Sequence, residues 1–135
     1  RAVVDDRAPL RRIESGADGW LSSVRNAIVD VLVVTGSTDP DAVPMYLTAV
    51  SEIATNAIEA HERAGSLDPV VVSIDPLLAQ VMVADLGGGF DPGAFLSLPE
   101  PSQVHGRGLF LARQFCPGLS WQRTAGGMEC TLPFP

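Results

Sequence analysis

An acid and an amide separated by four positions, Glu52 and Asn56, are the side chains in this sequence best spaced to act together. On an α-helix, residues four apart lie one above the other, so both would project from one face, with Glu59 following on the same side. A carboxylate can accept a proton, and an amide oxygen can bind a hard metal ion. Taken alone, this polar stripe is equally consistent with an ordinary solvated helix face.

Two glycine-rich segments further along the chain add features typical of a ligand site. Asp85 ends an apolar run and is followed by Gly87 and Gly89, which permit a sharply turned backbone that approaches a ligand closely. The segment Gly106-Arg107-Gly108 leads into an apolar stretch that begins at Leu109. Glycines at a helix N-terminus leave backbone N–H groups that can face an anion.

Apolar residues that recur every three or four positions predict three helices, and the second of them carries the acid–amide pair. Asp18 is expected to be the N-cap of the first helix and Gly36 its C-cap. Asp39 or Asp41 is expected to cap the second helix, which stops at Gly65. The predicted helices run from the residues after Asp18 to Gly36, from Asp39 or Asp41 to about Ala64, and over Leu109–Phe115.

Strands are predicted where β-branched and apolar residues lie between turn residues. An edge strand is expected around residues 10–14, an antiparallel hairpin over 70–74 and 78–84, and a second hairpin over 119–124 and 128–134. Because helices and strands are segregated along the chain, we expect an α+β fold. The expected architecture is a two-layer α/β sandwich, in which three helices lie on one face of a mostly antiparallel sheet of four or five strands.

Composition limits the function classes. The 135 residues fit one domain, and a chain that starts with Arg1 is consistent with a domain excised from a longer protein. The net charge of -7 argues against direct nucleic-acid binding. The absence of Lys argues against a P-loop and against a Schiff-base mechanism, because each uses a lysine side chain. There is no signal peptide or membrane span in the sequence, so we expect a cytoplasmic protein with no membrane partner. Cys116 and Cys130 are expected to be buried thiols.

The three motifs occur in a fixed order that resembles the N, G1 and G2 boxes of the GHKL (Bergerat-fold) ATPases. These motifs are Glu52-x-x-x-Asn56, Asp85-x-Gly87-x-Gly89 and Gly106-x-Gly108-Leu109. More closely, they are similar to those of the anti-sigma-factor serine/threonine protein kinases of bacterial partner-switching systems. The resemblance covers residues 18–134 and implies binding of ATP with Mg²⁺.

The resemblance also implies a role for each residue of the first two motifs. Asn56 would bind Mg²⁺, and Asp85 would accept a hydrogen bond from the adenine amino group. Gly87 and Gly89 would let the backbone pass close to the base. Glu52 would be the general base that accepts the proton of an incoming serine or threonine hydroxyl.

The third motif is implied to cover the phosphates. Gly106 and Gly108 would let the loop fold over them, and the helix that starts near Leu109 would stabilise their charge. Arg107 would either pair with a phosphate or lie exposed in a lid. His61 and His105 are expected to be surface or lid residues.

Two positions depart from the family pattern. Family members usually have Thr after the glycine that precedes the last strand, where this chain has Met128. The helix of the first motif often continues Glu-His-Ala, where this chain has Glu59-Ala60-His61. The first departure makes adenine affinity less secure.

The resemblance implies a kinase that phosphorylates an anti-anti-sigma (STAS-type) partner, sequesters a sigma factor and acts as a homodimer. Two alternatives stay open. One is a nucleotide-binding regulatory module that works by protein association alone, and the other is a detached ATP-binding domain of a sensor histidine kinase. Intact Glu52 and Asn56 favour the kinase, whereas Met128 modestly favours the association module.

Overall fold

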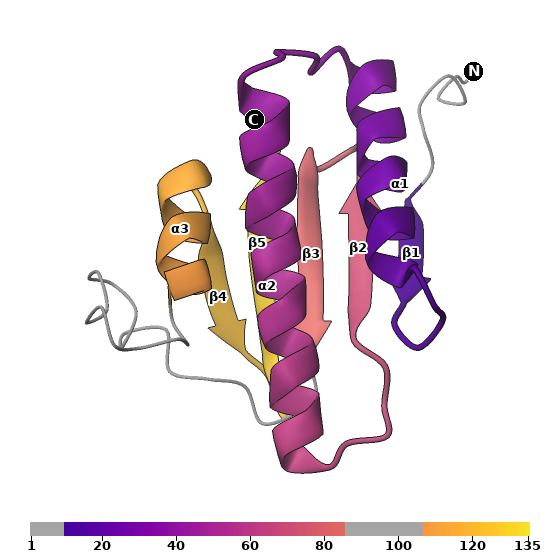
Figure 1. Ribbon diagram of the computed structural model, residues 1–135. Coiled ribbons are helices and arrows are strands. Elements are labelled where there is room, and N and C mark those ends of the chain that lie inside the picture. Colours follow the sequence, from indigo (N-terminus) through magenta and orange to yellow (C-terminus); the bar gives the residue numbers. More distant parts are fainter. Residues whose placement is uncertain (1–9, 86–106) are drawn as a thin grey trace.

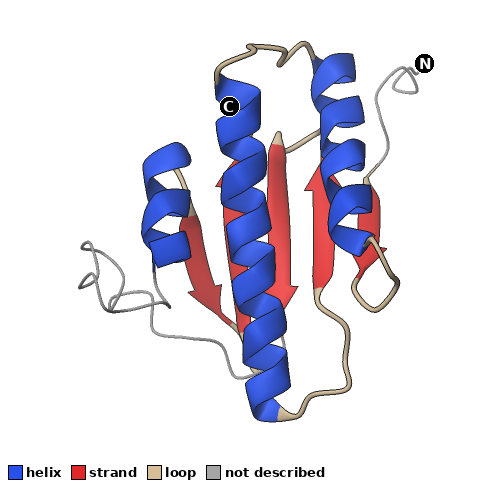
Figure 2. Ribbon diagram, in the orientation of Figure 1, coloured by secondary structure: helices blue, strands red, loops and turns tan. Residues whose placement is uncertain are grey.

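The computed structural model describes residues 10–85 and 107–135, with the backbone alone for residues 107–109. This part of the chain forms one sheet covered on one face by helices, as Figures 1 and 2 show. The helices are α1 (Trp20–Thr35), α2 (Ala42–Ala64) and α3 (Arg107–Phe115). The strands are β1 (Arg11–Glu14), β2 (Val71–Asp75), β3 (Gln80–Asp85), β4 (Ser120–Arg123) and β5 (Met128–Pro133). The predicted α+β fold is confirmed.

The five described strands lie in the order β1-β2-β3-β5-β4, and every neighbouring pair is antiparallel. Both predicted hairpins are present, β2 with β3 and β4 with β5. The last strand of the chain lies between β3 and β4, so it pairs with a strand that ends more than forty residues earlier. This pairing places Asp85 opposite Met128.

The core lies between the sheet and the helices. Alternate residues of β2, β3 and β5 are buried, as expected for strands with one face against a helical layer. Tyr46 of α2 is buried, and its hydroxyl donates a hydrogen bond to the backbone carbonyl of Leu132 in β5. The ring of Tyr46 also meets Phe134 edge to face, with 6.2 Å between ring centroids. These contacts hold the first half of α2 on the sheet.

Glycines end the two long helices as predicted. Gly36 and Gly65 adopt left-handed backbone angles after α1 and α2, and their N–H groups bind carbonyls of the last helical turn. At the start of α2, Asp39 Oδ1 accepts the N–H groups of Asp41 (2.8 Å) and Ala42 (3.3 Å). Of the two predicted caps, Asp39 therefore provides the side-chain hydrogen bonds.

Two predictions about element starts are wrong. The N-cap of α1 is Gly19, with positive φ, rather than Asp18, and no side-chain capping bond is formed at this described end. Strand β3 begins at Gln80 rather than at Leu78, because Asp75 Oδ1 accepts the N–H groups of Leu77 and Leu78 and holds them in a turn.

None of the helices in residues 10–85 and 107–135 has both the length and the apolar character needed to cross a membrane.

Candidate functional site

Helix α2 lies between α1 and α3 on the sheet and packs against both (Figure 1). Leu47 and Ser51 line a cavity together with Arg25 of α1, so their side of α2 faces α1. At 100° per residue, Glu52 and Asn56 project about 140° around the helix from that side. They therefore lie on the flank of α2 that faces α3, as one stripe, and both are half-buried.

The amide of Asn56 has a defined orientation. Its Nδ2 donates a hydrogen bond to the backbone carbonyl of Glu52, with 2.7 Å between the heavy atoms. A carbonyl can only accept, so the NH₂ group occupies this contact and Oδ1 points away from it. Mg²⁺ prefers oxygen ligands and usually binds through one or two protein groups together with substrate phosphates and water. The residue thus fits the expected metal role.

Asp85 is the last residue of β3 and is only 3% exposed. Its Oδ1 lies 3.2 Å from Nε2 of His61, near the C-terminal end of α2. The other ring nitrogen of His61, Nδ1, lies 2.8 Å from the backbone carbonyl oxygen of Asp68. The carboxylate expected to recognise a base is therefore held from the helical layer by a second side chain.

His61 was expected on the surface or in a lid, and that prediction is wrong, because the side chain is only 5% exposed. A signal for burial exists in the sequence. His61 follows Ala54 by seven residues and Ala57 by four, which places it on the apolar face of α2. Both alanines are buried. The prediction relied on the polarity of histidine, whereas helical periodicity assigns position 61 to the core.

Met128 lies directly opposite Asp85 in the pairing of β3 with β5 and is 3% exposed. Opposite residues in an antiparallel pair project from the same face of the sheet, so both side chains face the helical layer. A thioether is at most a weak acceptor and donates no hydrogen bond. Donors to the Asp85 carboxylate must therefore come from elsewhere, and His61 is one.

The third motif is described in part. The backbone of Arg107, Gly108 and Leu109 forms the first turn of α3, two residues ahead of the predicted start at Leu109. Helix α3 packs against α2, on the flank that carries the acid–amide stripe. Gly87, Gly89, Gly106 and His105 lie outside the described residues. So do the side chains of Arg107 and Leu109.

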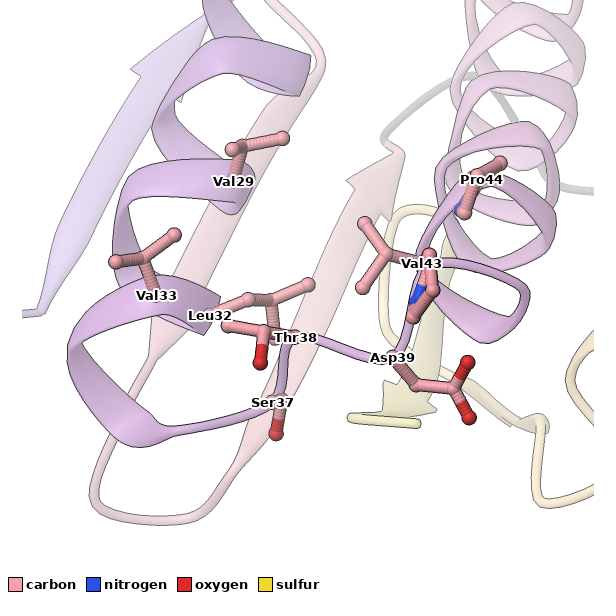
Figure 3. A pocket seen from close by; sticks show the side chains of 9 residues that line it. Val29, Leu32, Val33, Ser37, Thr38, Asp39, Val43 and Pro44 are labelled. Carbon is pink, nitrogen blue, oxygen red and sulfur yellow. The ribbon is translucent and has the colours of Figure 1, made fainter.

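A separate cavity of about 250 Å³ lies between the second half of α1 and the start of α2. Figure 3 shows its lining, which is mostly apolar and includes Val29, Leu32, Val33 and Val43. It contains none of the expected site residues. Val43 and His61 are eighteen residues apart on one helix, which corresponds to roughly 27 Å.

Within residues 10–85 and 107–135, no group of three or more His, Cys, Asp or Glu side chains is arranged to hold a metal ion.

Comparison with known proteins agrees with this arrangement. Residues 18–134 match the family model of the histidine kinase-like ATPase domain. A search of curated proteins found no match. The matched segment begins just before α1 and ends just after β5, so it includes every helix described above and all strands except β1.

Proposed function

The chain belongs to the histidine kinase-like ATPase domain family, an ATP-binding module of the GHKL type, and from this premise we propose that it is a serine/threonine protein kinase. The observation that carries the proposal is the placement of Glu52 and Asn56. Both project from the α3-facing flank of α2, and the Asn56 amide is anchored by its Nδ2, so that its oxygen takes no part in the contact with the Glu52 carbonyl. An acid and an amide oxygen that can bind a metal ion therefore lie on one face, about one helical turn apart.

Each residue has a distinct task in the proposed reaction. Asp85 accepts a hydrogen bond from the amino group of adenine. Asn56 provides an oxygen ligand for Mg²⁺, which when bound neutralises phosphate charge during transfer. Glu52 accepts the proton of a serine or threonine hydroxyl as that oxygen attacks the γ-phosphorus. The bond between the γ-phosphorus and the bridging oxygen breaks, and ADP leaves.

The N-terminus of α3 lies beside this flank. The first backbone N–H groups of a helix have no partner within the helix and carry partial positive charge. Phosphate oxygens are stabilised by such groups. Helix α3 packs against α2, and its first turn is at residues 107–109. This packing supports the proposal that the first turn binds phosphates near the proposed metal ligand.

We further propose that the acceptor is an anti-anti-sigma protein of the STAS type, and that the chain also binds a sigma factor as a homodimer. The support is the resemblance of the three motifs to those of anti-sigma-factor kinases.

The test is a transfer assay with γ-labelled ATP, Mg²⁺ and candidate anti-anti-sigma proteins. We expect label on a serine or threonine of the acceptor. Glu52→Ala should lower the transfer rate at least about 100-fold, the lower range for loss of general base catalysis, while nucleotide affinity stays similar. Glu62→Ala is the matched control, because Glu62 is an exposed acid on the same helix. Substantial transfer by Glu52→Ala would remove Glu52 from the mechanism.

One observation favours a second function, a nucleotide-binding module that regulates by association alone. Met128 is buried opposite Asp85 and donates no hydrogen bond there. Under this alternative, the protein binds ATP and its partner but transfers no phosphate to any acceptor. A detached sensor-kinase domain would instead transfer phosphate to a histidine, which acid-labile label would reveal.

A further inference from the structure

His61 is a buried polar side chain that the proposed reaction does not use. It lies on α2, one turn beyond the acid–amide stripe, and contacts two other segments of the chain. Nε2 reaches Asp85 Oδ1 at the end of β3, and Nδ1 reaches the carbonyl oxygen of Asp68 in the connection to β2. The ring is therefore held at both nitrogens.

The two contacts define where the protons lie. The Asp68 carbonyl can only accept, so Nδ1 carries a proton and donates it. The contact between Nε2 and Oδ1, at 3.2 Å, then requires one further proton between the two atoms. With Asp85 as a carboxylate, that proton is on Nε2, and the bond is charge-assisted. If Nε2 carried a lone pair instead, two acceptors, Nε2 and the carboxylate oxygen, would face each other and no hydrogen bond could form.

The surroundings of Asp85 give this bond its importance. Its neighbour across the sheet, Met128, offers no donor, and both side chains are buried on the helical side of β3 and β5. A carboxylate has about four lone-pair sites, so Asp85 can accept a hydrogen bond at Oδ1 that orients the group and can also accept one from a ligand. Side chains that bind ligands act best when a second group fixes their rotamer.

We propose that His61 is a positioning residue for base recognition. By donating Nε2–H to Asp85 Oδ1, with its ring anchored at Asp68, it fixes the orientation in which the carboxylate accepts the 6-amino group of a purine. His61 thereby sets the preference of the site for adenine over purines that lack this amino group. The inference rests on the proposed role of Asp85 in nucleotide binding.

The test compares two ligands by calorimetry on the full chain, Mg·ATP and the Mg complex of purine riboside triphosphate, which lacks the 6-amino group. The wild type should prefer ATP. In His61→Ala this preference should fall roughly tenfold, the size expected when a hydrogen bond to a charged group is lost, with most of the change in ATP affinity. His61→Gln keeps an N–H donor and should restore part of the preference.

Tyr46→Phe is the matched control for a structural role. It also removes a buried hydrogen bond made by α2, the bond to Leu132, but at the opposite end of the helix. Its melting temperature should fall while its preference for ATP stays at the wild-type value. If His61→Ala likewise loses stability and keeps the full preference, the positioning role is overturned.

Asp85→Asn separates this inference from the proposed function. Loss of the preference in Asp85→Asn but not in His61→Ala would overturn the role of His61 alone. An unchanged preference in Asp85→Asn would instead remove Asp85 from base recognition, and the proposed nucleotide site with it.

A further measurement reads the wild type directly and needs no variant at His61 or Asp85. The chain has two histidines, so ¹⁵N ring spectra of the wild type and of His105→Gln assign the His61 signals. The ¹⁵N signal of His61 Nε2, the nitrogen that contacts Asp85, should shift more with ATP than with purine riboside triphosphate. Equal shifts with the two ligands would contradict the inference.

Discussion

Met128 and Asp85 lie directly opposite each other across β3 and β5, and both are buried beneath the helical layer. A residue that donates no hydrogen bond thus occupies the nearest cross-strand position to the only buried carboxylate among the described residues. The relationship makes position 128 a direct means of changing the proposed nucleotide site.

Met128→Thr should raise affinity for ATP several-fold, because a hydroxyl opposite Asp85 can donate to the carboxylate or to the bound base. The same change should lower the free energy of unfolding by about 1–3 kcal/mol, since it removes buried thioether volume. Calorimetric titration with Mg·ATP and urea unfolding measure the two effects. Met128→Val is the control, because valine has nearly the shape of threonine without the hydroxyl. Equal ATP affinity in the two variants would show that the hydroxyl contributes nothing.

Asn56→Ala should lose most of the increase in nucleotide affinity that Mg²⁺ provides, because the variant lacks the side-chain oxygen expected to bind the ion. Titrations with ATP in the presence of Mg²⁺ and of EDTA give the difference. Thr55→Ala serves as control, since Thr55 is exposed at the preceding position of the same helix. A variant whose affinity responds to Mg²⁺ as the wild type does would contradict the metal role.

Stability should fall as pH rises above about 8.5, the ordinary pKa of a thiol. Burial raises the pKa of Tyr46, Cys116 and Cys130, so the folded state keeps protons that the unfolded state releases. The unfolded state then binds fewer protons, and each such group lowers the free energy of unfolding by up to about 1.4 kcal/mol per pH unit. Urea unfolding from pH 7 to 10.5 measures the slope.

The absence of Lys from the sequence makes this alkaline experiment easy to interpret. One Tyr, two Cys and the α-amino group are the groups of the chain whose ordinary pKa lies in that range. The double variant Cys116→Ala, Cys130→Ala should show a shallower slope. A stability that stays constant up to pH 10.5 would contradict the burial of these three groups.

Asp39→Ala should lower the free energy of unfolding by about 1 kcal/mol, because Asp39 Oδ1 accepts two backbone N–H groups at the start of α2. Asp18→Ala should change it by less than about 0.5 kcal/mol, since Asp18 is exposed and does not cap α1. Chemical unfolding of the two variants compares a cap that forms with one that does not. Similar losses in both would contradict the assignment of Asp39 as the capping side chain.

The local sequence pattern was sufficient to predict the helices and strands and the acid–amide pair of the candidate site. Helical spacing put Glu52 and Asn56 on one face of α2, and glycines marked where α1 and α2 end, because both properties depend on neighbours within one turn. The prediction that Asp18 is the N-cap of α1 was wrong. Gly19, with left-handed backbone angles, occupies the N-cap position, so no side-chain cap forms at this end of the described helix.

The sequence by itself determined the α+β class, the two hairpins and the acid–amide stripe, since these follow from periodicity and turn chemistry. Only the tertiary structure decided that β5 lies beside β3, which brings Met128 opposite Asp85, and that His61 reaches the same carboxylate from α2. These contacts join residues 24 to 43 positions apart. Strand order and helix docking, which depend on long-range packing rather than local propensity, decide which of them form.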